Sequence, residues 1–278
     1  MSRTPEDPMS TSVDASRHTT VSVALRDIVS ALDIELRTVE TPEYAGALNG
    51  LQVANNGLVS RVAVAVDAST SAVTEAARRQ ADLLIVHHGL FWNGAQPLVG
   101  TGYQKFRTLM NNNIAVYSTH LPLDAHPILG NNVRLANELG LSPTSGFGRY
   151  KNIDVAVAGE CDELASALVD RVRIFSAGYG GTVRTSIALE GRRTRQWAIV
   201  TGGGASTDTL REARERGIDT LIVGEGPHHT TVEAQEHDLL VVYAGHYATE
   251  TLGVQSVGGW IESRFGLPWS FLHLPTGS

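Results

Sequence analysis

Two residues with metal-binding or acid–base chemistry, His246 and Glu250, stand four positions apart in GHYATE, just after the apolar run LLVVYA. The helix predicted to follow has apolar residues at helical spacing: Val254, Val257, Ile261 and Phe265. Glu250 lies four residues before Val254, and His246 lies four residues before Glu250. At this helical spacing the carboxylate continues the buried face. A buried carboxylate needs a cationic partner. Arginine is the ordinary one, but no arginine or lysine lies near these strand ends in sequence, which favours a divalent cation.

A second pair with the same spacing, His120 and Asp124, lies in STHLPLD. The segment AVYSTHLPLD (115–124) resembles VVYAGHYATE (241–250) at a shift of 126 residues. Each has an apolar strand, a histidine at its end and a carboxylate four residues later. An aspartate after proline is ordinarily a cap or turn residue, but the match to Glu250 favours a ligand role for Asp124.

Neighbouring histidines, His87 and His88, end the apolar run DLLIV. Side chains of adjacent strand residues point to opposite faces. Either the strand bends at His88-Gly89 and both rings reach one site, or each histidine serves a different ion of a pair. A pair of satisfied histidines at a strand end is the plainer alternative. A second histidine pair, His228 and His229, follows TLIVGEGP. For this pair, a contact with a metal ligand rather than with the metal, or packing within the loop, is a stronger explanation than metal binding.

Most histidines follow apolar strands, and eight of the ten lie between residues 87 and 246. Ligands of open α/β sheets bind beyond the carboxyl ends of the strands, so the pattern predicts one composite site. The remaining histidines are predicted to be surface or tail residues: His18, His126, His237 and His273. The glycines of TGGGAS (201–206) fit no P-loop or dinucleotide fingerprint. They predict a tight strand-to-helix turn, with a phosphate contact as the weaker alternative.

Strand and helix patterns alternate and repeat along the chain. Residues 62–88 align with 199–225 without a gap, and ten positions agree. In both segments a serine, Ser69 or Ser206, falls where a helix N-cap belongs. We therefore predict an α/β protein of two interlinked domains of similar topology, related by internal duplication, with a metal site at their interface. The predicted domains are residues 21–125 plus 251–278 and residues 126–250, after a disordered tail over residues 1–20.

The overall composition narrows the class of protein. The chain has 278 residues, 42% of them hydrophobic, a formal charge of −7 and no run of lysine and arginine, which argues against nucleic acid as a partner. No apolar run approaches the 18 residues of a membrane span. The single cysteine, Cys161, excludes an internal disulfide and fits a reducing compartment. We expect a cytoplasmic protein.

The spaced set of HH, HLPLD and GHYATE resembles the dinuclear metal centre proteins known as GTP cyclohydrolase I type 2 and its homologues, the NIF-three-like family. The resemblance runs from about residue 23 to 272 and includes these segments: NGLQV (49–53), LLIVHHGLFW (83–92), STHLPLDAH (118–126), GFGRYKNI (146–153), WAIVTGGGAS (197–206), VGEGPHH (223–229) and AGHYATETLG (244–253). Members commonly have proline where this chain has Gly89, and aspartate where it has Glu225. Neither departure falls on a residue expected to bind metal.

This resemblance implies two divalent metal ions per subunit, zinc, iron or manganese, and a homohexamer. The ligands that it implies are His87, His88, Asp124, His246 and Glu250, with carboxylates bridging the ions. It also implies a metal-dependent hydrolase in which a metal-activated water attacks a nucleotide such as GTP. Proton transfer would then fall to His120 or His228.

Two other functions remain open from the sequence. The first keeps the metal ions but changes the substrate, giving a phosphoesterase or amide hydrolase. The second is a non-enzymatic, metal-binding hexameric scaffold in which the ions hold two domains together. Fold does not determine function, so the sequence does not choose among these.

Overall fold

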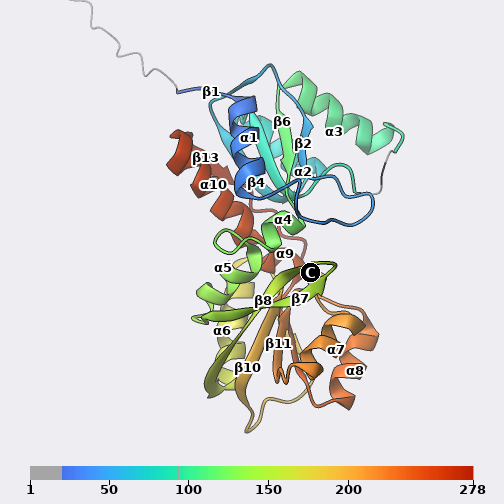
Figure 1. Cartoon of the computed structure of the whole chain (residues 1–278). Coiled ribbons are helices and arrows are strands. Elements are labelled where there is room, and N and C mark those ends of the chain that lie inside the picture. Colours follow the sequence, from blue (N-terminus) through green and yellow to red (C-terminus); the bar gives the residue numbers. More distant parts are fainter. Residues whose placement is uncertain (1–20, 93, 95, 278) are drawn as a thin grey trace, which may run out of the picture.

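The computed structural model describes residues 21–277 except residues 93 and 95. The tail predicted for residues 1–20 lies outside the described residues. Two large mixed sheets, each with helices on both faces, lie one above the other in Figure 1. The structure therefore confirms the predicted α/β class.

The first sheet has five strands in the order β13-β4-β5-β6-β2. Their bounds are β13 (Trp269–Phe271), β4 (Val62–Asp67), β5 (Leu83–His88), β6 (Ala115–Ser118) and β2 (Gly50–Val53). All neighbours are parallel except the antiparallel pair β6 and β2. Because helices cover both faces, β4 and β5 are near-continuous apolar runs rather than alternating ones. A small antiparallel ribbon joins β1 (Val23–Ala24) to β3 (Leu58–Val59).

Two helices lie on each face of the first sheet. They are α1 (Leu25–Glu35) with α10 (Thr251–Phe265), and α2 (Thr70–Arg78) with α3 (Gly100–Asn111). The stripe predicted on α10 is borne out, because Val254, Val257 and Ile261 are fully buried in the core with α1. Both ends of the described chain thus contribute to this sheet, since α10 and β13 follow the second sheet in sequence. The exact domain boundaries stay a prediction.

The second sheet has six strands in the order β7-β8-β10-β11-β12-β9. Their bounds are β7 (Pro143–Tyr150), β8 (Ile153–Leu164), β10 (Arg193–Val200), β11 (Thr220–Val223), β12 (Leu240–Tyr243) and β9 (Arg184–Thr185). The trio β10-β11-β12 is parallel, as is β4-β5-β6 in the first sheet. The helices α5 (Asn131–Glu138) and α6 (Ala165–Gly178) cover one face, and α7 (Thr207–Glu215) and α8 (His228–Glu236) cover the other.

The two parallel trios agree in topology, and both predicted N-caps form. Ser69 Oγ accepts the backbone N–H of Ala72, and Ser206 Oγ accepts that of Thr209. The strand register differs, however. Ile85 lies opposite Val64 in the first sheet. A constant shift of 137 would place Thr201 opposite Ile222, but the residue found there is Ile199, two positions earlier. The TGGGAS loop takes up the difference, so the gap-free alignment does not describe equivalent strand positions.

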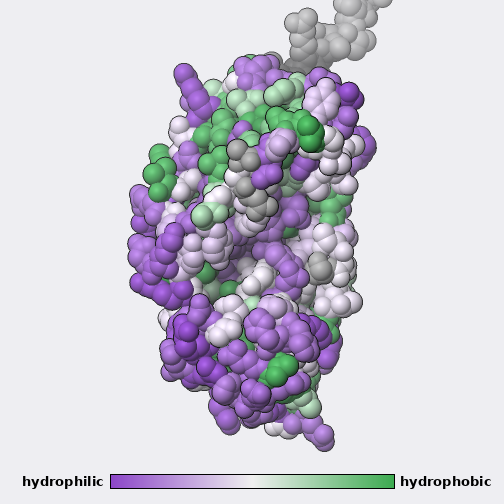
Figure 2. All heavy atoms as spheres, turned by 90° about the vertical axis from the view of Figure 1, so that its right-hand side faces the viewer, coloured by the Kyte–Doolittle hydropathy of each residue, from purple (hydrophilic) through white to green (hydrophobic). Residues whose placement is uncertain are grey.

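Two short helices connect the sheets at mid-height: α4 (Leu121–Asp124) and α9 (His246–Thr249). Each begins just beyond the carboxyl end of a parallel strand, β6 or β12. The face of the molecule in Figure 2 is hollowed between the two halves, and hydrophilic residues surround this recess. No helix in the described part of the chain combines the length and the apolar character that crossing a bilayer requires.

Candidate metal centre

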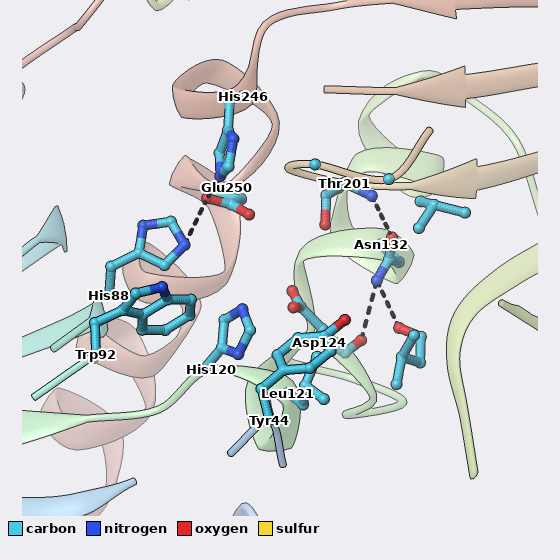
Figure 3. A pocket seen from close by; sticks show the side chains of 14 residues that line it. Tyr44, His88, Trp92, His120, Leu121, Asp124, Asn132, Thr201, His246 and Glu250 are labelled. Atoms are coloured by element: carbon cyan, nitrogen blue, oxygen red, sulfur yellow. Dashed lines mark hydrogen bonds and ion pairs between the residues drawn. The ribbon is translucent and has the colours of Figure 1, made fainter. Parts of the chain in front are cut away.

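Five predicted ligands converge where the strand ends of the two sheets face one another. His87 and His88 end β5, Asp124 ends α4, and His246 begins α9. Glu250 joins α9 to α10, so the predicted helix is interrupted at this residue. Figure 3 shows four of them around one pocket, together with His120. The structure thus brings side chains from distant parts of the sequence together.

Glu250 divides the cluster into two halves, because its two oxygens face different partners. Oε1 lies 3.5 Å from Nε2 of His87, and the same nitrogen lies 3.5 Å from Oδ2 of Asp124. We call these groups the buried half. Oε2 lies 3.4 Å from Nε2 of His88 and 3.1 Å from Nε2 of His246. We call these groups the exposed half. The adjacent histidines of β5 therefore approach different oxygens of one carboxylate.

Two polar atoms at the centre of the cluster fit a bound cation. Nε2 of His87 and Oε2 of Glu250 are buried and make no hydrogen bond within the described structure. Such atoms are costly to bury without a partner. Donor separations of 3.1–3.5 Å also suit a shared ion, since zinc bonds of about 2.1 Å in a tetrahedron put neighbouring donors about 3.4 Å apart. Nitrogen and oxygen donors without sulfur suit zinc, iron or manganese.

The charges in the cluster shift the pKa values of three of its side chains strongly. Burial by itself would lower the pKa of His87, yet the carboxylates of Asp124 and Glu250 raise it to about 10. Burial would likewise lower the pKa of His246, but its contact with Glu250 raises it to about 9. Burial raises the pKa of Glu250, while the imidazoles of His88 and His87 lower it well below its usual value. Opposite charge therefore outweighs desolvation at all three groups.

An oxygen acceptor holds the Nδ1 atom of each cluster histidine. In the exposed half the acceptors are carboxylates. Asp67 Oδ1 lies 2.8 Å from Nδ1 of His88, and Glu225 Oε1 lies 2.8 Å from Nδ1 of His246. In the buried half the acceptor is the carbonyl oxygen of Thr119, 2.9 Å from Nδ1 of His87. In the neutral ring, the proton held at Nδ1 leaves Nε2 available for a cation. A bound cation would displace the second proton that the raised pKa values of His87 and His246 imply at neutral pH.

Glu225, where the family resemblance departs, is not one of the five predicted ligands. Its carboxylate nevertheless contacts the ring of one of them, His246.

Asp124 is oriented by an amide that the sequence analysis missed. Asn131 Nδ2 donates to Asp124 Oδ1 at 2.9 Å, and Asn131 Oδ1 accepts the backbone N–H of Gly253 at 2.8 Å. Asn131 thus links the buried half to α10. Asp67, which ends β4 beside His88, could have been found from its place at a strand end, whereas nothing in the local sequence around Asn131 signals its role.

The TGGGAS loop presses against the cluster from the second sheet. Gly202 has a φ of +63°, and a Cβ at this position would collide with Oε1 of Glu250. Its backbone N–H donates to Thr249 Oγ1 at 3.0 Å. The loop bends at Gly202 and Gly203 without a hydrogen-bonded turn of its own, and it closes one side of the cluster. The tight turn itself stays a prediction.

His120 lies within the site, whereas His228 does not line it. The ring centroid of His120 is 4.9 Å from that of His87 and 5.7 Å from that of His88. Its Nδ1 lies 3.0 Å from Oε1 of Glu43, a contact that the sequence analysis also missed. His228 instead begins α8 with an exposed side chain outside the pocket lining. The donor atoms of His87, His88 and His120 lie within 4.8 Å of one another and could hold a metal ion as a group. Geometry therefore keeps His120 as a candidate for proton transfer or metal binding, and leaves His228 outside the pocket lining.

His126 was expected at the surface and is buried instead. Its Nδ1 accepts the backbone N–H groups of Ile128 and Leu129, and its Nε2 lies 3.6 Å from Oε1 of Glu35. It ties the turn after α4 to α1. Burial lowers its pKa, which is consistent with a structural role for a neutral ring.

Comparison with known proteins shows the family. The profile of Duf34/NIF3 (NGG1p interacting factor 3) matches residues 23–274. The chain belongs to the Duf34/NIF3 family. The GTP cyclohydrolase 1 type 2 homolog of Deinococcus radiodurans is 36% identical over 233 residues, which cover 83% of this chain and 86% of that protein. The protein of the same name from Pyrococcus abyssi is 36% identical over 262 residues, covering 90% and 98%.

A solved structure agrees with this assignment. TTHA1606 from Thermus thermophilus superimposes with a TM-score of 0.79 at 34% identity, covering 92% of this chain and all of that one. The likeness therefore includes both sheets and the segments that carry the cluster. All five clustered donors lie within the residues that the Duf34/NIF3 profile matches.

Proposed function

We propose that this Duf34/NIF3 protein is a metal-dependent hydrolase with two divalent cations per subunit. The observation that carries the proposal is the position of Glu250, whose two oxygens face different pairs of donors in a buried cluster. The ligands would be His87, Asp124 and Glu250 for one cation, and His88, His246 and Glu250 for the other. Zinc, iron and manganese all suit this donor set.

Two adjacent cations would lower the pKa of a water molecule and polarise the bond that it attacks. The protein's own residues would provide the rest. His120 faces the pocket with its Nδ1 held by Glu43, so its Nε2 would take or return a proton during hydrolysis. Glu43 is itself held by the side-chain amide of Asn49 at 2.8 Å, which would keep the imidazole in one orientation.

The proposed substrate is a small molecule, with a nucleotide such as GTP as the first candidate. The names of relatives such as those from D. radiodurans and P. abyssi support this choice. Hydrolysis would open the imidazole ring of the purine, with water adding at C8. The proposed setting is the cytoplasm, and the proposed assembly is a homohexamer.

A metal-binding scaffold is the second candidate, and one observation favours it. The donors come from both sheets, because His87 and His88 end a strand of the first, whereas His246 follows the end of a strand of the second. Bound cations would therefore join the two halves of the molecule whether or not any substrate reacts.

The decisive experiment is elemental analysis of purified protein, followed by turnover assays of the metal-loaded form with GTP and with phosphoesters. A hydrolase predicts about two ions per subunit and metal-dependent turnover that a chelator removes. A scaffold predicts the same metal content and a loss of thermal stability on chelation, but no turnover. Protein without metal under all loading conditions would contradict both, and light scattering of the same samples tests the hexamer.

A further inference from the structure

The cavity beside the cluster has one aromatic wall. Trp92 stands nearly perpendicular to His88 and His120, with ring centroids 5.3 and 4.7 Å apart. Tyr44 continues the wall, with its ring centroid 5.7 Å from that of His120. Figure 3 shows both aromatic side chains on the same side of the pocket as His120. Aromatic side chains provide stacking surfaces for flat rings.

The opposite wall is the loop after β10, which is rich in glycine and which we call the glycine wall. Val200, Thr201, Gly203 and Gly204 line the cavity here. A Cβ on Gly204 would collide with the carbonyl oxygen of Val200, so this position has no room for a side chain. The cavity has a volume of about 280 Å³, just below the range of roughly 300–1,000 Å³ for ligand pockets.

The charged groups at this cavity are mostly acidic. The carboxylates that line it are Asp124 and Glu250, and three more lie directly behind the histidines: Glu43, Asp67 and Glu225. Two divalent cations would bring four positive charges to these five carboxylates. Little positive charge would then remain to attract a polyphosphate.

The basic side chain beside the aromatic wall is already engaged. Lys151 donates to the carbonyl oxygen of Glu43 at 3.0 Å, and its Nζ lies 5.1 Å from the ring centroid of Tyr150. Tyr150 in turn packs against Tyr44. Phosphate recognition usually relies on arginine or lysine side chains directed at the phosphate oxygens, whereas Lys151 is directed at the backbone.

We propose that this cavity recognises a planar, uncharged heterocyclic ring, and that phosphate groups do not contribute to binding. A nucleotide would enter base first, between Trp92 and the glycine wall, with its phosphates outside the cavity. The inference rests on the proposed function, since it names the substrate class for the same site. It differs from a phosphoesterase, in which a phosphate would face the cations.

The first test is binding of guanosine and of GTP to the full-length, zinc-loaded protein by calorimetry. Zinc content is measured after each titration, because GTP can itself chelate the metal. We expect the two dissociation constants to agree within about threefold, the difference expected if no charged contact is gained. GTP binding more than tenfold tighter, competition by inorganic triphosphate, or no binding of either compound at about 1 mM would overturn the proposal.

Variants locate the bound ring. Trp92→Ala should weaken guanosine and GTP equally, by roughly tenfold, the size of one stacking contact. Trp92→Phe should restore most of the affinity, with zinc content unchanged in both. Lys151→Ala should leave the ratio of the two affinities unchanged, and a selective loss of GTP binding in this variant would overturn the proposal. Binding does not require turnover. Guanosine binding without turnover of GTP or of phosphoesters would therefore contradict the hydrolase and keep this inference.

Discussion

The two halves of the donor cluster differ in what stands behind their histidines. In the buried half the side chain of His87 is fully buried and that of Asp124 is 11% exposed, and a carbonyl oxygen and the amide of Asn131 hold them. In the exposed half the side chains of His88 and His246 are 18% and 28% exposed, and two further carboxylates hold them. Added negative charge is tolerated near solvent and is costly in the interior. We therefore infer that the carboxylates behind the histidines, Asp67 and Glu225, strengthen metal binding mainly in the exposed half.

The largest effect is expected from Glu250→Gln, because one oxygen of Glu250 faces the buried half and the other faces the exposed half. A neutral amide loses the charge that both cations need, so metal content should fall from about two ions per subunit to well below one. Elemental analysis measures the loss, and circular dichroism checks that the variant is folded. Glu262→Gln, on the exposed face of α10, is the matched control and should keep both ions. If the Glu250 variant still holds two ions, Glu250 is not a ligand that both cations need.

Next in size is Gly202→Ala, which would push a methyl group into the carboxylate of Glu250 and place alanine at a φ of +63°. Such backbone strain costs about 1–3 kcal/mol. We expect a lower melting temperature and at least tenfold weaker binding in both halves. Gly203→Ala is the control, because a Cβ there meets nothing within 4 Å and φ is not positive. Equal behaviour of the two variants would show that this loop does not press on the cluster.

Asp67→Asn and Glu225→Gln should separate the halves from one another. Losing either carboxylate should weaken one binding step by about 10–100-fold, the usual effect of removing a partner of a ligand histidine. The other step should be unchanged, because the buried half relies on the carbonyl of Thr119. Stepwise zinc titration measures this, with the exposed Asp170→Asn as control. Equal weakening of both steps would contradict the assignment.

The smallest effect on metal binding is expected from Asn131→Ala. Asp124 would lose one hydrogen bond and the buried N–H of Gly253 would lose its acceptor. Leaving such a group unsatisfied costs about 1–3 kcal/mol. We expect a lower melting temperature and a few-fold weaker buried half, with the exposed half unaffected. Asn137→Ala, exposed on the same helix, should change neither measurement.

Local patterns were sufficient to predict most of the fold. Apolar runs such as LLIVHH formed buried parallel strands, and Ser69 and Ser206 formed the predicted N-caps. These features depend on a few neighbouring residues, so they can be found without tertiary information. The strand register of the second sheet was not predicted, because a gap-free alignment cannot show that the loop after β10 is two residues longer than the loop after β4.

The candidate site was predicted only as far as its innermost residues. Histidines and carboxylates at strand ends pointed to the cluster. Glu43 lies on a connecting segment and Asn131 begins α5, and neither belongs to a distinguishing pattern of its own. The surface prediction for His126 was wrong because its burial depends on α1, about 90 residues earlier in the chain. Such partners are chosen by packing rather than by sequence spacing.

The sequence by itself determined which residue types stand at the strand ends and which face of α10 is buried, since periodicity and strand termini are local properties of the chain. Only the tertiary structure decided how Glu250 divides its two oxygens between His87 and His88, and that carboxylates stand behind one half and a carbonyl behind the other. Thr119 and Asp67 meet the histidines across neighbouring strands of the first sheet, and Glu250 reaches them from the junction of α9 and α10. These contacts join residues on separate elements, so local sequence patterns do not reveal them.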